Sequence, residues 1–208
     1  MSLSARWTRG RRGWRLPRPT LWLAAALAGL FLAFGAAPEA LLYDRQAIQD
    51  GELWRLLTGH LVHADPVHLA WNLAAFLVLG ALYETLARPS AARYLGLLAA
   101  SAVAIDAWLW WVEPGWSVYC GLSGVLNGLF AAVALALWRA TRNPLALLLL
   151  AGDFGKIALE AAQGGALLAT SSWSSVPGAH LAGLAAGLIL WLGSRPDRLW
   201  APFPRDGH

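Results

Sequence analysis

The chain has 208 residues, of which 58% are hydrophobic and only 13% are charged. This balance is typical of an integral membrane protein and argues against a soluble enzyme domain. The net charge of +4 does not predict a nucleic-acid partner, because the basic residues flank apolar segments as topology signals do. The single cysteine, Cys120, excludes an internal disulfide and a cysteine metal cluster, and no cofactor is predicted.

Residues 1–19 are rich in arginine and hold no acidic residue, which predicts a basic cytoplasmic segment. The apolar run from Leu21 to Ala37 follows and predicts the first membrane helix. The pair Arg11-Arg12 also suits a twin-arginine export signal. However, the apolar run is long for a cleaved signal, and Pro38-Glu39 follows it. We therefore expect a retained transmembrane helix.

Residues 44–65 are polar for this chain and predict an extramembrane loop with amphipathic pieces. Within this loop, Trp54 next to Arg55 suits the membrane interface, with the indole ring at the headgroups and the guanidinium in water. A second helix is expected at Pro66–Leu86. It begins with a proline that suits a first helical turn, and Asp65 suits its N-cap.

Four further apolar runs predict helices, separated by breaks such as Arg88-Pro89-Ser90 and Glu113-Pro114-Gly115. A Gly/Ser-rich loop, 164–175, precedes the last of them. The predicted fold is an all-α membrane protein, a six-helix bundle over residues 20–194 followed by a short cytoplasmic tail at 195–208. The expected bounds of the last four helices are about Ala91–Val112, Gly121–Trp138, Leu145–Gln163 and Pro177–Leu192.

Arginines in the connecting segments indicate the orientation of the bundle. With the N-terminus inside, the inner segments hold most of the basic residues. The outer loops hold only Arg45 and Arg55, and Lys156 lies within a helix. This positive-inside bias predicts that both termini are cytoplasmic. The second, fourth and sixth helices then start at the outer face, which is the periplasmic side of a bacterial inner membrane.

Polar residues gather near the starts of these three helices. His68 and Asn72 lie near the start of the second, Ser123 near the start of the fourth and His180 near the start of the sixth. At a rise of ~1.5 Å per residue, each lies only about 3–10 Å below the outer end of its helix. Polar groups at one depth on three helices are what an active site needs, with Ser123 as nucleophile and His180 as its base.

Glycines accompany both of these residues. Gly183 and Gly187 share a helix face with His180, and Ser123 shares a face with Asn127. A serine–histidine hydrogen bond between two helices requires a short interaxial distance, which glycines permit. The same pattern is also typical of a small-residue packing seam, in which the serine and the histidine only bond one helix to another.

Several motifs in series resemble the rhomboid family of intramembrane serine proteases over about residues 51–192. The resemblance implies a dyad of Ser123 and His180 that cleaves transmembrane segments of other membrane proteins near their outer end. It implies that His68 and Asn72 stabilise the oxyanion together with the backbone N–H of Ser123 or Leu122, beside Gly121. It also implies structural roles for Trp54, Arg55 and His63. The motifs are Trp54-Arg55, His63-x4-His68-x3-Asn72, Gly121-Leu122-Ser123-Gly124 and Ala179-His180-x2-Gly183-x3-Gly187.

Two positions are similar to the rhombosortase branch of that family. Many rhomboids carry an aromatic residue one turn below the serine, where this chain has Asn127, and Cys120 precedes the Gly-x-Ser. The likeness implies substrates with a C-terminal Gly-Gly-type sorting tail, made of a short motif, a hydrophobic helix and basic residues. The alternative is a general rhomboid protease with other type I membrane substrates. The candidates for the substrate pocket or for packing are Asn127, Gly183, Gly187 and Cys120.

Other interpretations of the polar residues stay open. His60, His63 and His68 with Asp65 suit a zinc site, which a metalloprotease would need. Asp106 lies at the depth of the candidate site and suits orienting a histidine as a third catalytic member.

The charged residues of the fifth helix have two interpretations. Lys156 suits an ion pair with Asp153 or Glu160, and the same residues suit recognition of a substrate tail. Two non-proteolytic functions are also considered. A catalytically inactive membrane-protein binder would be expected to lack the serine or the histidine, and a small transporter would be expected to show an inverted repeat.

Overall fold

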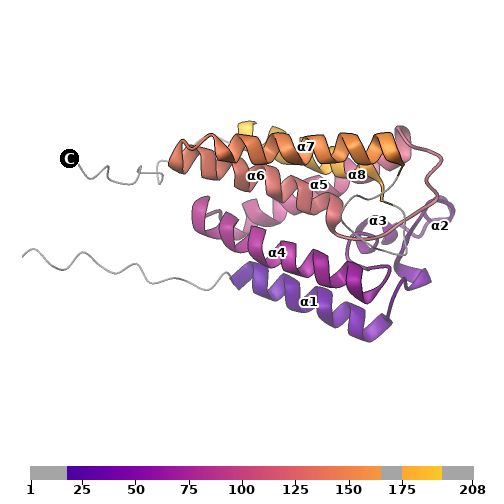
Figure 1. Cartoon of the computed structure of the whole chain (residues 1–208). Helices are drawn as coiled ribbons and strands as arrows, with labels where there is room; N and C mark the ends of the chain where they lie inside the picture. The colour runs from indigo at the N-terminus through magenta and orange to yellow at the C-terminus, as the bar shows by residue number, and fades with distance from the viewer. Residues whose placement is uncertain (1–17, 165–174, 194–208) are drawn as a thin grey trace, which may run out of the picture.

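The computed structural model describes residues 18–164 and 175–193. Most of the predicted basic segment, most of the Gly/Ser-rich loop and the predicted tail at 195–208 lie outside the described residues. Six long helices run side by side and dominate the molecule (Figure 1). They are α1 (Arg18–Phe34), α4 (Pro66–Leu86), α5 (Ala91–Trp111), α6 (Ser123–Thr141), α7 (Leu145–Gln163) and α8 (Pro177–Gly193).

Shorter elements lie between α1 and α4 and ahead of α6. In Figure 1, α2 and α3 lie together at one end of the bundle, on the right of the view. The short elements are η1 (Glu39–Leu41), β1 (Tyr43–Asp44), α2 (Arg45–Gln49), α3 (Arg55–Thr58) and β2 (Val118–Tyr119).

Local signals set where the helices begin and end. The Asp65 side chain accepts a hydrogen bond of 2.7 Å from the backbone N–H of His68 and caps α4, whose predicted bounds are confirmed. The predicted bounds of α7 are confirmed as well. In contrast, α6 begins later than predicted because Gly121 has a φ of +113°, which lies outside the helical region. Similarly, α1 ends before Gly35, whose φ is +77°.

Among the described residues, three helices are long and apolar enough to cross a membrane: α4, α5 and α6. Two more, α1 and α8, are apolar but shorter. The 19-residue α7 carries Asp153, Lys156 and Glu160. Large apolar side chains remain exposed on the outside, such as Trp22 at 76% and Leu192 at 75%, as a lipid-facing surface requires. The chain is therefore a multi-pass membrane protein. That all six long helices span the bilayer stays a prediction.

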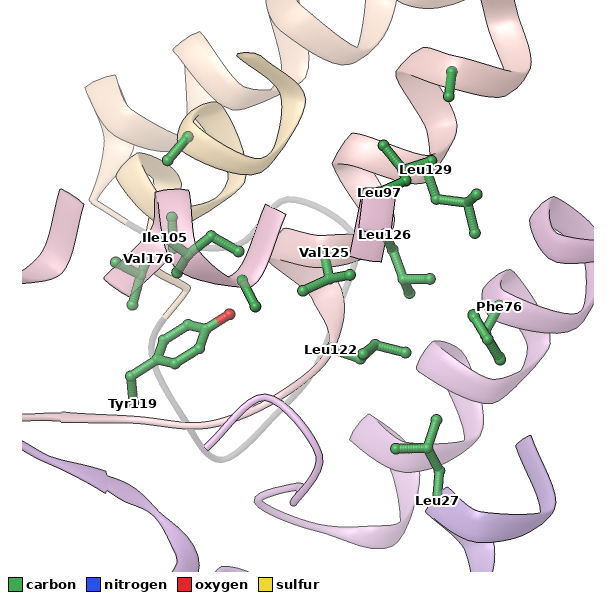
Figure 2. Packing of buried hydrophobic residues seen from close by; sticks show 14 of the residues in the cluster. Leu27, Phe76, Leu97, Ile105, Tyr119, Leu122, Val125, Leu126, Leu129 and Val176 are labelled. Carbon is green, nitrogen blue, oxygen red and sulfur yellow. The ribbon is translucent and has the colours of Figure 1, made fainter. Parts of the chain in front are cut away.

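The central helix of the bundle is α6, in which most residues from Gly124 to Ala136 are buried. It packs against α4, α5, α7 and α8. The core is therefore built around the helix that begins at Ser123. Figure 2 shows Val125 and Leu129 of α6 among side chains from other segments: Leu27, Phe76, Leu97, Ile105, Tyr119 and Val176.

A short antiparallel ribbon ties the loop before α4 to the segment before α6. Tyr43 of β1 pairs with Tyr119 of β2. Beyond the ribbon, the backbone N–H of Gly121 donates a hydrogen bond of 2.9 Å to the carbonyl of Gly59. The predicted all-α fold did not include this ribbon, in which each strand has only 2 residues. The ribbon anchors the turn that leads into Ser123.

Candidate active site

Ser123 and His180 lie in contact although they are 57 positions apart in the chain. Ser123 is the first residue of α6, and His180 lies in the first turn of α8. The distance between Ser123 Oγ and His180 Nε2 is 3.0 Å, and His180 is only 8% exposed. A hydroxyl within hydrogen-bonding distance of an imidazole is the geometry that activates serine as a nucleophile.

Two glycine pairs bring α6 and α8 into backbone contact beside this pair. A Cβ atom on Gly183 would overlap the carbonyl of Gly124, and a Cβ atom on Gly187 would overlap the carbonyl of Gly128. The two helices run in the same direction here, because both contacts advance by four residues. No residue larger than glycine fits at 183 or 187 unless the helices move apart.

Gly121 adopts a left-handed backbone conformation just before the serine, and the ring of His68 lies over it. A Cβ atom on Gly121 would be 2.6 Å from His68 Cε1 and 2.8 Å from His68 Nε2. The Nδ1 atom of His68 accepts a long hydrogen bond of 3.5 Å from the backbone N–H of Ala64. This bond favours the tautomer with the proton on Nε2, so His68 presents an N–H donor to the segment before Ser123.

Asn72 lies one turn after His68 on α4 and is 4% exposed. Its Nδ2 donates a hydrogen bond of 2.9 Å to the carbonyl of His68, which engages one of its two amide hydrogens. Leu122 precedes α6 and makes no side-chain cap, so the first N–H groups of α6 have no partner within their own helix. Backbone and side-chain donors are therefore available on α4 and α6, which pack together.

Asn127 and Cys120 flank the serine and have different surroundings. Asn127 Nδ2 donates a hydrogen bond of 2.8 Å to the carbonyl of Ser123. Cys120 is a free thiol, 6% exposed, in a small apolar cluster with Leu42 and Val62. Burial raises the pKa of the Cys120 thiol to about 12, so it stays protonated and is a poor nucleophile at neutral pH.

Trp54 and Arg55 differ from each other in their surroundings. Trp54 is 53% exposed, as expected at an interface. Its Nε1–H donates a hydrogen bond of 3.1 Å to the carbonyl of Ala40. The expectation that the Arg55 guanidinium lies in water is wrong, because Arg55 is only 7% exposed. It donates to the backbone carbonyls of Glu39 (2.5 Å) and Leu42 (3.0 Å). Arg55 therefore holds the chain that leaves α1 against the loop before α4.

His63 is fully buried behind His68. The two rings pack edge to face, with their centroids 5.1 Å apart. Burial lowers the pKa of His63 to about 4, so its imidazole is neutral at neutral pH. Its place is consistent with a structural residue that supports the His68 ring.

The residues considered for a zinc site point in different directions. His60 Nε2 lies 3.1 Å from Asp106 Oδ1, whereas His63 faces His68. In residues 18–164 and 175–193, no group of three or more metal-ligating side chains is placed to hold an ion. The structure pairs Asp106 with His60, which is a different histidine from the candidate base His180.

Tyr119 stabilises the turn before Ser123, a role that no sequence motif indicates. Its hydroxyl donates a hydrogen bond of 3.1 Å to the carbonyl of Gly121 and lies against Ser123 and the backbone N–H of Gly124. The ring lies in the core (Figure 2). It packs edge to face against His60, with the ring centroids 5.5 Å apart. Burial raises the pKa of this phenol, which keeps its O–H as a donor.

Comparison with known proteins identifies the family of this fold and site. The model of the rhomboid domain matches residues 50–195, which is more than half of the chain. The chain belongs to the rhomboid family. The match includes both Ser123 and His180, and all of the motif residues from Trp54 to Gly187.

A curated relative points to the same family. The chain is 32% identical over 124 residues to the "Putative rhomboid protease YdcA" of Bacillus subtilis (strain 168). That match covers 56% of this chain and 61% of the relative. The chain therefore spans less than two thirds of the length of that protein.

Proposed function

We propose that this rhomboid protein is an intramembrane serine endopeptidase, with Ser123 as nucleophile and His180 as general base. The observation that carries the proposal is the 3.0 Å distance between Ser123 Oγ and His180 Nε2. The glycine contacts between α6 and α8 support it, because they hold the two groups at this separation. The family, and the similarity to a putative rhomboid protease, support the reaction type.

The first half of the reaction forms an acyl-enzyme. Ser123 Oγ attacks the carbonyl carbon of the scissile peptide while its proton passes to His180 Nε2, and the carbonyl electron pair moves onto oxygen. The imidazolium of His180 then gives this proton to the leaving nitrogen as the C–N bond breaks. The amine product departs, and the acyl group stays on Ser123 Oγ.

The second half of the reaction restores the enzyme. A water molecule attacks the acyl carbon and gives a proton to His180 Nε2. The new tetrahedral intermediate collapses, the bond to Ser123 Oγ breaks, and the same proton returns to Oγ. The carboxylic acid product departs.

The developing oxyanion needs donors that are in place before the reaction. In the proposed site they are the His68 Nε2–H, the second amide hydrogen of Asn72 and the backbone N–H of Ser123. Removing one such donor typically lowers kcat by about 10²–10³-fold. His68→Ala and Asn72→Ala are each expected to reduce cleavage without abolishing the reaction of Ser123 with a small probe.

The proposed setting is a bacterial inner membrane crossed by the six long helices, with both termini cytoplasmic. The starts of α4, α6 and α8 would then lie near the periplasmic side, just below the headgroups. Substrates would be membrane-anchored proteins whose hydrophobic segment enters the bundle at this depth. In lipid, the backbone of such a segment is hydrogen-bonded within its own helix. Local unwinding near the outer end would expose a peptide bond to the candidate catalytic groups.

The proposal is tested with the purified full chain in liposomes of bacterial lipid. A fluorophosphonate probe is expected to label the wild type, and Ser123→Ala and His180→Ala are expected to lose both labelling and cleavage of a transmembrane reporter. Ser117→Ala, at an exposed serine ahead of β2, is the matched control and is expected to behave as the wild type. Labelling that persists in Ser123→Ala would contradict the proposal.

We propose that the substrates are proteins with a C-terminal sorting tail. This proposal rests on Asn127 and Cys120, the two positions at which the chain is similar to the rhombosortase branch. Two reporters with one transmembrane segment separate the possibilities, one with and one without a Gly-Gly motif before the segment and arginines after it. Faster cleavage of the tailed reporter is expected. Equal cleavage would favour a general rhomboid protease with other type I substrates. Binding of both without labelling or cleavage would favour a non-catalytic membrane-protein binder.

A further inference from the structure

A buried carboxylate on α7 faces the side of His180 that is turned away from Ser123. Glu160 is 1% exposed, and its Oε2 lies 3.5 Å from His180 Nδ1. Its other oxygen, Oε1, lies 2.9 Å from Lys156 Nζ, one turn earlier on the same helix. Glu160 therefore connects a lysine on α7 with the imidazole on α8.

The ion pair with Lys156 does not by itself explain why Glu160 is buried. An i,i+4 pair of this kind stabilises an exposed helix by only about 0.2–0.5 kcal/mol, and the lysine side chain is itself 29% exposed. Moving a carboxylate out of water has a large unfavourable free energy unless a further partner compensates it. The structure also places the ring of His180 within ion-pair distance of Glu160.

The tautomer that the proposed reaction needs supplies that partner. Ser123 Oγ lies at Nε2, so Nε2 must carry a lone pair to accept the serine proton, and the ring hydrogen must be on Nδ1. Nδ1 is buried and makes no hydrogen bond within the described residues. Nδ1 and Glu160 Oε2 lie 3.5 Å apart, within ion-pair distance but without a formed hydrogen bond, and such catalytic contacts often tighten when substrate binds.

We propose that Glu160 is a positioning residue for His180, completing a Ser123–His180–Glu160 triad in which Lys156 fixes the carboxylate. Glu160 Oε2 accepts the Nδ1–H, which selects the tautomer and the ring orientation. Its negative charge stabilises the imidazolium once Nε2 has taken the serine proton. This inference rests on the proposed protease function, since Glu160 acts only through His180.

Other titratable groups also face His180 from the helices around it. His68 on α4 and Asp153 on α7 both interact electrostatically with His180. On α5, Asp106 is paired with His60, and Glu113 after the end of that helix lies against Gly178. Among the described residues, Glu160 is the carboxylate that the structure places within ion-pair distance of Nδ1. A control at Asp153 therefore separates a contact at Nδ1 from a general effect of negative charge on α7.

The test uses the full chain in liposomes and measures cleavage of a transmembrane reporter as a function of pH. Glu160→Gln removes the charge and is expected to lower kcat at least tenfold, with a smaller change in KM. The acidic limb of the kcat/KM profile is expected to move to lower pH, because the imidazolium loses its neighbouring carboxylate. Glu160→Asp, which keeps the charge, is expected to restore part of kcat. Asp153→Asn is expected to stay within threefold of the wild type.

A second variant keeps the test decisive if Glu160→Gln does not fold. Lys156→Met leaves the carboxylate without its ammonium partner, so the acidic limb is expected to move to higher pH. A folded Glu160→Gln with wild-type kcat and an unmoved acidic limb overturns the inference, as does an unmoved limb in Lys156→Met. If Ser123→Ala still cleaves, it is the proposed function that fails, and this outcome is distinct from both.

Discussion

Gly183 of α8 packs directly on the backbone carbonyl of Gly124 of α6. Ser123 immediately precedes Gly124, and His180 lies one turn before Gly183, so this contact sets the separation of the two candidate catalytic groups. The hydroxyl and the imidazole meet because the two backbones touch beside them. The glycine seam, usually explained as helix packing alone, here has a consequence for chemistry.

Gly183→Ala is expected to separate α6 and α8 at the level of the site. The added methyl group would overlap a backbone carbonyl, which cannot rotate away as a side chain can. Overpacking of this kind destabilises by about 1–3 kcal/mol, and a misplacement of about 1 Å lowers the rate by about 10²-fold. We expect reporter cleavage to fall by that factor, with a lower thermal unfolding midpoint.

The matched control for this prediction is Gly152→Ala on α7. An added Cβ atom there meets nothing within 4 Å, so only helix propensity changes. Alanine is favoured over glycine in a helix by about 0.8–1.0 kcal/mol, and the variant should be as active as the wild type and slightly more stable. Equal activity of Gly183→Ala and Gly152→Ala would show that the seam does not position the dyad.

Helix bounds were predictable where the sequence carries local signals. The limits of α4 and α7 are as predicted, because Asp65 with Pro66 begins the one and Gly164, with a φ of +69°, ends the other. The observed start of α6, Ser123, lies later than the predicted start at Gly121. An apolar run does not indicate that Gly121 adopts a non-helical φ, nor that the His68 ring lies where a Cβ atom of residue 121 would be.

Contacts between segments that are distant in the sequence could not be predicted, because local sequence patterns do not encode them. The β1–β2 ribbon has strands of 2 residues, too short to show alternation. The burial of Arg55 depends on carbonyls 13 and 16 positions earlier in the chain. Within α7, the spacing indicated the pair of Lys156 with Glu160. It could not indicate that α7 would turn the second oxygen of that carboxylate toward α8.

Gly121→Ala is expected to impair the proposed oxyanion site through both backbone strain and a side-chain overlap. A φ of +113° strains any residue with a Cβ atom, and here that atom would lie 2.6 Å from the His68 ring. We expect cleavage to fall at least tenfold because His68 is displaced. Gly51→Ala is the matched control, since Gly51 has a φ of +104° but nothing within 4 Å of an added Cβ. It should lose stability by about 1 kcal/mol and keep its activity.

The buried His63 predicts a loss of stability at acidic pH. Its pKa is about 4 in the folded protein, against 6.5 for an unperturbed histidine. Above pH 6.5 the ring is neutral in both states. Between pH 6.5 and 4 only the unfolded chain binds the proton, so the folded state becomes less stable as the pH falls, by up to about 3 kcal/mol.

This dependence is measured by thermal unfolding in detergent at pH 7 and pH 4.5. The wild type should lose more stability between the two values than His63→Phe, whose ring cannot be protonated. Only the difference between the two chains is compared, because exposed carboxylates titrate in both. If both chains lose the same stability, His63 does not titrate on unfolding.

Tyr119→Phe removes the hydroxyl that bonds the turn before Ser123. Tyr43→Phe is the matched control, because Tyr43 pairs with Tyr119 in the ribbon. The Tyr119 hydroxyl donates to the carbonyl of Gly121, so its loss leaves a buried acceptor unpaired, at a cost of about 1–3 kcal/mol. The Tyr43 hydroxyl is buried and makes no hydrogen bond within the described residues, so its removal should be neutral or slightly stabilising. We expect Tyr119→Phe to fold with cleavage and fluorophosphonate labelling reduced about tenfold, because the turn that presents Ser123 is no longer fixed. Equal effects of the two substitutions on labelling would show that the phenol of Tyr119 contributes only to packing.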